Sequence, residues 1–269
     1  MMNKRKVFIS FVVIFLVSVF SVIAYQKLHS LRDSHLAYTK PIPSVEQIEH
    51  KYQDQKPSEW SEDFEGITSR LLPRPKSPRV YLTFDACGGE YDKALIDYLI
   101  QEQIPATLFI NSRWIDKHHD AFMELAHNPL FSIQNHGTLH RPLSVNGREI
   151  YHIKGTNSIQ EVYEEIMQND ALITKLTGTR PRYFRSGTAY YDDIAVKIAK
   201  DLGYQIGGFD VLGDGGATFS TARIIEQAKQ ARDGSILIYH FNKPQGDTFE
   251  GIKKIVPLLR QRGFTFEKL

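Results

Sequence analysis

The stretch Tyr81-Leu82-Thr83-Phe84-Asp85 ends an apolar run with a carboxylate. Together with the preceding valine, the run 80–84 has the length and composition of a short buried strand. Residues 92–101 then place apolar side chains on one side of a predicted helix, and 106–110 return to a strand pattern. The sequence therefore predicts a strand-helix-strand unit whose first strand is followed directly by an ionisable residue.

The same alternation continues to the carboxyl terminus. Ser158 and Glu161 form a capping-box pattern before a helix that Gly178 ends. Further strands are predicted at 131–134, 183–184, 204–209, 236–240 and 264–267, and further helices at 115–126, 192–202 and 220–232, with a last helix before 264. About seven strand-helix units indicate an α/β fold with a parallel sheet, either doubly wound or a barrel. A barrel fits better, because no glycine-rich dinucleotide turn follows the first strand.

Composition narrows the class of protein. The chain has 269 residues, is 42% hydrophobic and carries a formal net charge of +2, which is ordinary for a globular protein. It has no basic block interleaved with aromatic residues, so nucleic acid is not an expected partner. Its single cysteine, Cys87, excludes an intramolecular disulfide.

The amino terminus carries a targeting signal. Lys4, Arg5 and Lys6 precede an uninterrupted apolar run over 7–24. Such a run is either a cleaved signal peptide or a membrane anchor, and its length favours the anchor. Because positive residues stay on the cytoplasmic side, the rest of the chain is predicted to be exported, periplasmic or extracellular, and tethered to the inner (cytoplasmic) membrane.

Three regions follow from these patterns. Residues 1–24 are the predicted signal peptide or anchor. Residues 25–77, rich in proline and charge, are a predicted connector that packs partly on the domain through apolar residues such as Trp60 and Phe64. Residues 78–269 are the predicted catalytic domain.

Polar residues stand at the ends of five predicted strands, where the active sites of parallel α/β folds collect. They are Asp85, His136, Arg185, Asp210 and His240. Any one of them is typically a turn or helix cap, but five at equivalent places indicate a site.

The spacing of His136 and His140 favours a metal ion. On a helical turn, residues four apart lie on one face, so both imidazoles can reach one ion. Zinc suits imidazole ligands, polarises a carbonyl and lowers the pKa of bound water. Asp85 suits the role of a base, His240 that of an acid, and Arg185 that of a partner that orients Asp85.

The ordered motifs resemble those of the polysaccharide deacetylase family, also called the NodB-homology group or carbohydrate esterase family four. The resemblance covers residues 79–269. It is carried by Thr83-Phe84-Asp85, His136-Gly137-Thr138-Leu139-His140, Phe184-Arg185, Phe209-Asp210-Val211 and Gly234-Ser235-Ile236-Leu237-Ile238-Tyr239-His240. The resemblance implies a distorted (β/α) barrel that removes N-acetyl groups from amino sugars of glycans. It further implies Asp85 as catalytic base, His240 as general acid, and His136 and His140 as ligands of a divalent metal, zinc first, with cobalt, manganese and nickel as alternatives.

One departure from the family pattern concerns the metal. The family has a second aspartate directly after the first, and this chain has Ala86 there. Cys87 on a strand would point to the opposite side from Ala86, so it is not a simple replacement. Three interpretations follow: Asp85 itself binds the metal, which we favour; water or a distant carboxylate such as Asp214 fills the gap; or the metal binds weakly or not at all.

The later motifs depart from the family pattern as well. The segment after Arg185 lacks the family's Pro-Pro-Tyr, and the acids after 209 lack its usual spacing. Tyr190, Asp210 and Asp214 are therefore assigned to substrate binding only as candidates. The expected function is extracytoplasmic N-deacetylation of a polymer containing N-acetylglucosamine, such as peptidoglycan. An O-acetyl esterase and a catalytically silent glycan-binding protein are the alternatives.

Overall fold

Strand β3 (Arg79–Ala86) is the centre of the fold, and all eight of its residues are buried. It pairs in parallel with β4 (Ala106–Ile110) on one side and with β12 (Ile236–His240) on the other. Burial on both faces explains why the sequence at β3 is an apolar run and not an alternating one. The computed structural model describes residues 41–74 and 76–269. The helices and strands of these residues belong to one compact unit, Pro43–Leu269.

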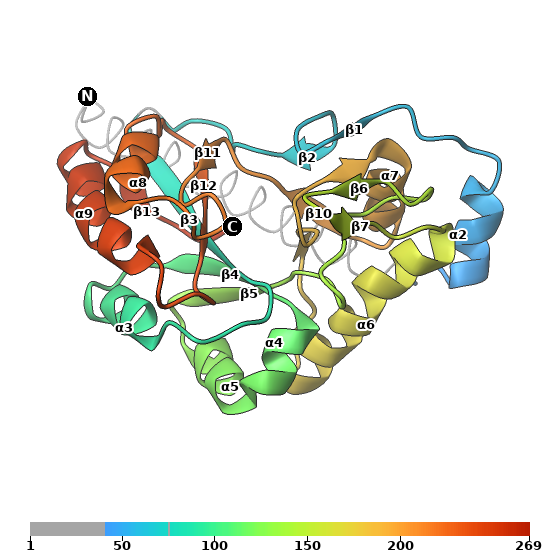
Figure 1. The fold of residues 1–269 in the computed structure, drawn as a ribbon, viewed down its shortest axis with the longest axis horizontal. Helices are drawn as coiled ribbons and strands as arrows, with labels where there is room; N and C mark the ends of the chain where they lie inside the picture. The colour runs from blue at the N-terminus through green and yellow to red at the C-terminus, as the bar shows by residue number, and fades with distance from the viewer. Residues whose placement is uncertain (1–40, 75) are drawn as a thin grey trace, which may run out of the picture. The chain divides into compact units, whose positions relative to one another are not determined.

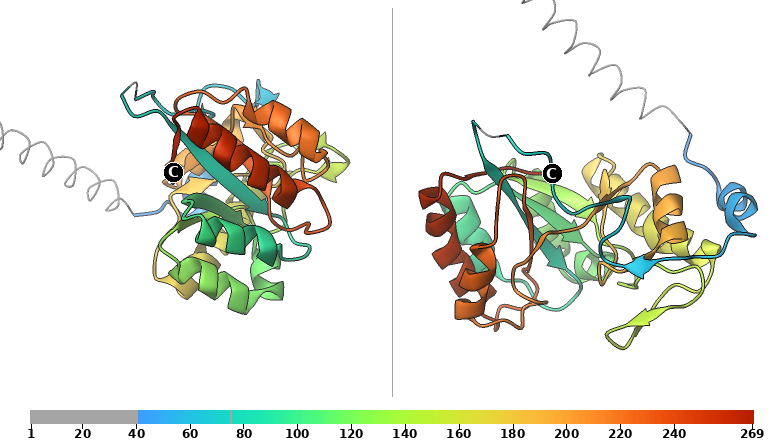
Figure 2. Two further views of the ribbon diagram at one scale, coloured as in Figure 1. Left: turned by 90° about the vertical axis from the view of Figure 1, so that its left-hand side faces the viewer. Right: turned by 90° about the horizontal axis from the view of Figure 1, so that it is seen from above.

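The main sheet has nine strands, and every pairing in it is parallel. Its order is β11 (Val211–Leu212), β12, β3, β4, β5 (Phe131–Asn135), β8 (Tyr183–Phe184), β10 (Gln205–Gly207) and β2 (Ile67–Thr68), with β13 (Thr265–Phe266) also beside β3. The sheet curls into a half-barrel (Figures 1 and 2), which confirms the predicted distorted barrel. Within the described part of the chain the order has two ends, β11 and β2, so hydrogen bonds do not close the ring.

Helices cover the outside of this sheet (Figure 1). They are α2 (Val45–Tyr52), α3 (Lys93–Gln101), α4 (Ser112–Lys117), α5 (His119–His127), α6 (Ile159–Thr177), α7 (Asp193–Asp201), α8 (Thr221–Ala228) and α9 (Thr248–Gln261). Two short pairs complete the fold: β1 (Trp60–Ser61) with β9 (Tyr191–Asp192), and β6 (Glu149–Ile150) with β7 (Ile153–Lys154).

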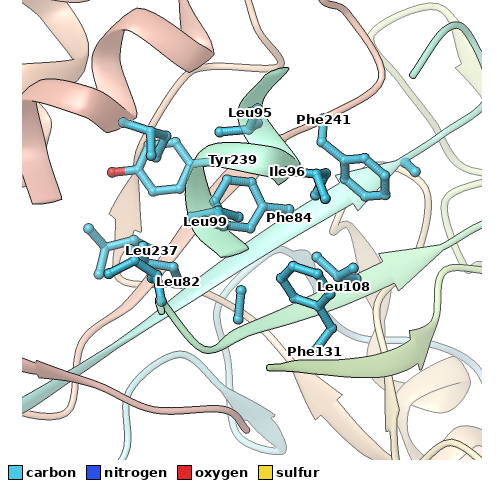
Figure 3. Packing of buried hydrophobic residues seen from close by; sticks show 14 of the residues in the cluster. Leu82, Phe84, Leu95, Ile96, Leu99, Leu108, Phe131, Leu237, Tyr239 and Phe241 are labelled. Atoms are coloured by element: carbon cyan, nitrogen blue, oxygen red, sulfur yellow. The ribbon is translucent and has the colours of Figure 1, made fainter. Parts of the chain in front are cut away.

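The larger of two apolar clusters lies between β3, β4, β12 and the helices α3 and α9. Phe84, Leu108 and Tyr239 are fully buried in it, and Figure 3 shows them packed against side chains of α3. A second cluster joins α2, α6 and α7 and includes Ile48 and Tyr52 of α2. In both clusters, apolar side chains of the helices pack against the sheet. The polar residues lie at the carboxyl ends of the strands.

Most predicted elements are present, but only one half of the predicted capping box at Ser158 and Glu161 forms, because the Glu161 carboxylate accepts the amide of Asn157 at 2.9 Å and not that of Ser158. The Ser158 hydroxyl accepts the amide of Glu161 at 3.1 Å, and Gly178 ends α6 with a left-handed φ of 69°. The single helix predicted at 115–126 is instead two helices, because the chain leaves helical geometry at His118, with φ −127° and ψ 43°.

The amino-terminal predictions are tested only in part. Residues 1–24, the predicted targeting segment, and residues 25–40 of the connector lie outside the described residues. From residue 43 onward the connector forms α2, β1 and β2, of which the sequence predicted only the packing of apolar side chains. Among the described residues, no helix has the length and apolar character needed to cross a membrane.

Candidate metal-dependent active site

Four of the five predicted strand-end residues meet at one edge of the sheet. Asp85 and His240 are register partners on β3 and β12. His136 follows β5, and Arg185 follows β8. The structure does not bring Asp210 to them: its carboxylate accepts the amide of Ile236 at 3.0 Å and the hydroxyl of Ser235 at 2.9 Å. These contacts lie at the amino end of β12, the end opposite His240. Asp210 stands just before β11, which runs parallel to β12, so Asp210 lies at the amino ends of these strands.

Arg185 is fully buried and holds the catalytic candidate Asp85. Its Nη1 donates to the Asp85 carboxylate at 2.7 Å and to the Thr83 hydroxyl at 2.9 Å. Its Nε and Nη2 donate to the carbonyls of Gly207 and Gly208 at 2.8 and 2.9 Å. A planar guanidinium tied at four acceptors has little freedom, so it fixes the orientation of the carboxylate.

Two opposing effects set the pKa of Asp85. Burial favours the neutral acid and would raise the pKa, but the charges of Arg185, His136 and His240 outweigh it and lower the pKa below its ordinary value. Asp85 is therefore an ionised carboxylate, 2% exposed, at neutral pH.

His136 presents one ring nitrogen to the site. Its Nδ1 lies 2.9 Å from the carbonyl of Arg185, and because a carbonyl only accepts, Nδ1 carries the proton. Nε2 then keeps its lone pair, 3.4 Å from the Cys87 sulfur and 3.7 Å from the Asp85 carboxylate. Burial lowers the pKa of His136, which favours the neutral imidazole that a metal ligand must be.

His140 lies on a loop, not on the helical turn that the spacing suggested. Residues 136–140 follow β5 without helical structure, and His140 has a left-handed φ of 61°. The buried carboxylate of Glu165 shapes this loop by accepting the amide of Leu139 at 3.0 Å and of Arg141 at 3.2 Å. The two imidazoles still meet, with ring centroids 5.1 Å apart.

Gly187 allows a second segment to reach this loop. A Cβ at position 187 would come within 2.3 Å of the His140 carbonyl carbon, closer than real contacts permit. The segment after Arg185 can therefore pack on the backbone of His140 only because residue 187 is glycine.

Cys87 completes the group that the sequence pattern left incomplete. The ligand atoms of Cys87, His136 and His140 all lie within 4.8 Å of one another, and Asp85 is not part of this set. Ala86 is fully buried in the larger apolar cluster. The signal for Cys87 was present in the sequence: alternation along a strand puts residues 85 and 87 on one side and residue 86 on the other.

The three residues fit a divalent ion. His140 Nε2 is buried without a hydrogen-bond partner, which is costly for a polar atom unless something binds it. The separation of 3.4 Å between Cys87 Sγ and His136 Nε2 is close to the ~3.6 Å expected for tetrahedral ligands at zinc bond lengths of ~2.3 and ~2.1 Å. Burial opposes ionisation of Cys87, but His140 and His240 lower the pKa of its thiol to about 7.

His240 is held by Asp214. One carboxylate oxygen of Asp214 lies 2.9 Å from His240 Nδ1, and the other accepts the backbone amide of His240 at 2.7 Å and the hydroxyl of Thr248 at 2.8 Å. Burial disfavours the charged ring, yet Asp214 raises the pKa of His240 well above its ordinary value. The structure thus places Asp214, a candidate for substrate binding, fully buried behind His240.

Tyr190, the other candidate for substrate binding, lies in an aromatic group. Its ring centroid is 5.7 Å from that of Trp60 and 5.9 Å from that of Tyr151, which is 65% exposed. The backbone carbonyl of Tyr190 accepts the amide of Leu143 at 3.1 Å, which ties this group to the segment that follows His140.

At the strand ends the half-barrel carries the Asp85-Arg185 pair, His240 held by Asp214, and three residues that could hold a metal ion. A family model described as polysaccharide deacetylase matches residues 73–207, and the chain belongs to this family, carbohydrate esterase family 4. No curated protein matches the chain.

Solved structures share the fold at low sequence identity. A family 4 pseudoenzyme from Bacillus anthracis is 19% identical in sequence, with a TM-score of 0.63. The match covers 81% of this chain and 69% of the pseudoenzyme's chain. A peptidoglycan N-acetylglucosamine deacetylase is 20% identical over 76% of this chain and 91% of its own, with a TM-score of 0.64. A family 4 carbohydrate esterase from Bacillus subtilis is 21% identical over 74% and 82%, with a TM-score of 0.61.

Proposed function

We propose that this protein is a metal-dependent N-deacetylase that releases acetate from amino sugars of a polysaccharide or of peptidoglycan. The observation that carries the proposal is the position of Asp85 beside the group of Cys87, His136 and His140, with its carboxylate 3.7 Å from His136 Nε2. A base next to a metal group is what amide hydrolysis by water requires. Family membership supports the same reaction class.

The residues divide the work as follows. Cys87, His136 and His140 would hold a divalent ion, zinc being the best match to one thiolate and two imidazoles. When bound, the ion would supply Lewis-acid polarisation of the acetyl carbonyl and of the attacking water. Asp85, oriented by Arg185, takes a proton from the water as its oxygen bonds to the acyl carbon. His240 gives a proton to the amine as the carbon-nitrogen bond breaks, and Asp214 holds the imidazole for that transfer.

Acetate release tests this reaction. We expect the purified zinc- or cobalt-loaded protein to release acetate from N-acetylglucosamine oligomers or from peptidoglycan, and a chelator to abolish the release. Including an O-acetylated glycan of similar size separates amide from ester hydrolysis. If a folded, metal-loaded sample binds these glycans but releases acetate from none, the protein is a silent binder and the proposal fails.

We also propose that the domain works outside the cytoplasmic membrane. The support is the sequence of residues 4–24, in which Lys4, Arg5 and Lys6 precede the apolar run. We expect protease added to spheroplasts to degrade the domain and to leave a cytoplasmic marker intact. Protection of both proteins to the same extent would contradict an external location.

A further inference from the structure

Asn111 stands between two of the residues of the metal group. β4 pairs in parallel with β3 on one side and with β5 on the other, and the last residues of the three strands are in register. The residues that follow these strand ends are Cys87, Asn111 and His136, which therefore lie side by side at the carboxyl edge of the sheet. Asn111 is fully buried there.

The carboxamide of Asn111 forms hydrogen bonds through both of its ends. Its Nδ2 donates to the carbonyl of His136 at 3.1 Å and to that of Gly137 at 2.7 Å. Its Oδ1 accepts the backbone amide of Arg113 at 3.1 Å and the Nε of the same arginine at 3.2 Å. These four bonds allow one orientation only, because exchanging the oxygen and the nitrogen would set an acceptor against two carbonyls.

Arg113 continues the connection to the segment of Cys87. While its Nε is bonded to Asn111, its Nη2 donates to the carbonyl of Cys87 at 2.9 Å. The backbone of Asn111 adds a bond in the same direction, since its amide donates to the carbonyl of Ala86 at 3.0 Å. A continuous hydrogen-bonded path thus runs from the backbone of His136, through Asn111 and Arg113, to the backbone of Cys87.

Capping of α4 accounts for only one of these bonds, the one from the backbone amide of Arg113 to Asn111. Serine or aspartate at position 111 would cap a helix equally well. Asparagine differs because the same side chain also has two donors, and both are used on the segment that carries His136. The guanidinium likewise reaches two acceptors at once in a fixed geometry, which a lysine ammonium does not.

We propose that Asn111 and Arg113 are positioning residues that set the spacing of Cys87 and His136 for a metal ion. This inference rests on the proposed function, because it concerns the metal group of that function. Cys87 and His136 are 49 residues apart in the chain, yet Sγ and Nε2 lie 3.4 Å apart. Ligands held at this separation before an ion binds need no rearrangement, so tying their backbones together raises the affinity for the ion.

The zinc affinity of Arg113→Ala is the first test. The side chain of Arg113 is exposed, so we expect the metal-free variant to melt at the same temperature as the unaltered protein. Competition with a chromogenic chelator should show zinc binding about 10- to 100-fold weaker, and zinc should raise the melting temperature less. The cobalt form should keep its thiolate absorption, because Cys87 is still present. A purely structural role would instead lower the melting temperature of the metal-free protein and leave zinc affinity unchanged.

Two control variants separate the hydrogen-bonded path from the effect of charge. Arg113→Lys keeps the positive charge but cannot bond to Asn111 and to the Cys87 carbonyl together, so it should lose nearly as much zinc affinity as Arg113→Ala. Lys243→Gln removes a charge from the same cavity, where Lys243 donates to the carbonyl of Gly216 at 2.9 Å, and should bind zinc as tightly as the unaltered protein. Full affinity in either Arg113 variant, or an equal loss in Lys243→Gln, would overturn the inference.

A double-variant comparison tests whether the two residues act together. Asn111→Ser keeps an oxygen that can cap α4 but loses the donors to His136 and Gly137. If Asn111 and Arg113 form one path, Asn111→Ser combined with Arg113→Ala should lose less zinc affinity than the product of the two single losses. Single losses that simply multiply would show two independent effects and contradict a shared path.

Zinc and cobalt binding are measured without a glycan, so this result does not depend on acetate release. A protein whose zinc affinity depends on Arg113 as expected, but which releases no acetate, would keep the positioning role and lose the proposed function. Acetate release by an Arg113→Ala variant with unaltered zinc affinity would keep the proposed function and remove the positioning role.

Discussion

Replacing Cys87 with alanine is expected to lower metal affinity by at least about 100-fold and to abolish acetate release. The reason is that the change removes one of three ligands, whereas altering the hydrogen-bond partners of ligands alone typically costs about 10- to 100-fold. Metal content after dialysis against a competing chelator measures the effect. The unaltered protein, in which the three ligand atoms lie within 4.8 Å of one another, serves as the reference in the same experiment.

Cys87→Asp is the informative control. A carboxylate can still bind a divalent ion, so this variant should retain metal, while its cobalt form should lose the near-ultraviolet absorption of a thiolate-cobalt bond. This readout does not depend on activity. If Cys87→Ala retains metal as tightly as the unaltered protein and Asp85→Asn loses it, then Asp85 is the ligand, as the sequence favoured, and Cys87 is not.

Replacing Arg185 with methionine is expected to destabilise the domain by about 3–5 kcal/mol, because the Asp85 carboxylate would remain buried without its partner. The guanidinium is 0% exposed and is the donor to Asp85, Thr83 and two backbone carbonyls, so several acceptors lose their hydrogen bonds together. For a domain of this size the change corresponds to a fall of roughly 6–20 °C in Tm. Urea unfolding and calorimetry measure it.

Two further variants identify the cause. Arg260→Met breaks an exposed pair with Glu102, whose side chains are 45% and 34% exposed, and should cost no more than about 1 kcal/mol. Asp85→Asn combined with Arg185→Met should recover part of the lost stability, because no charge is left buried alone. Equal destabilisation by Arg185→Met and Arg260→Met would show that the buried pair is not what stabilises this edge of the sheet.

Strand prediction succeeded where a local pattern and the tertiary environment agree. Residues 80–84, 106–110 and 236–240 are apolar runs, and each forms a central strand buried on both faces. The helix at 45–52 was not predicted, although Ser44 and Gln47 form a complete capping box there. Its apolar face is short, and tertiary contacts stabilise it: Ile48 and Tyr52 pack against the domain, and the Tyr52 hydroxyl donates to Asp201 at 2.8 Å.

The sequence predicted the site residues that stand at strand ends, and it predicted His140 from its spacing to His136. Asp85, His136, Arg185 and His240 follow that rule, and parallel pairing brings them together. Asp210 also follows a predicted strand, yet it directly precedes β11 and lies at the other end of the sheet. A short strand directly after another cannot be separated from it by hydrophobic pattern alone.

The sequence by itself determined the parallel α/β architecture and the chemical types at the strand ends, because both depend on local periodicity and on the direction of strands. Only the tertiary structure decided the third member of the metal group, Cys87, and how His140 reaches His136. The strand that contains Tyr81-Leu82-Thr83-Phe84-Asp85 continues one residue past Asp85 and turns Cys87 toward His136, while Glu165 bends the loop that carries His140. Those contacts join segments 26 to 49 residues apart, and no local pattern encodes them.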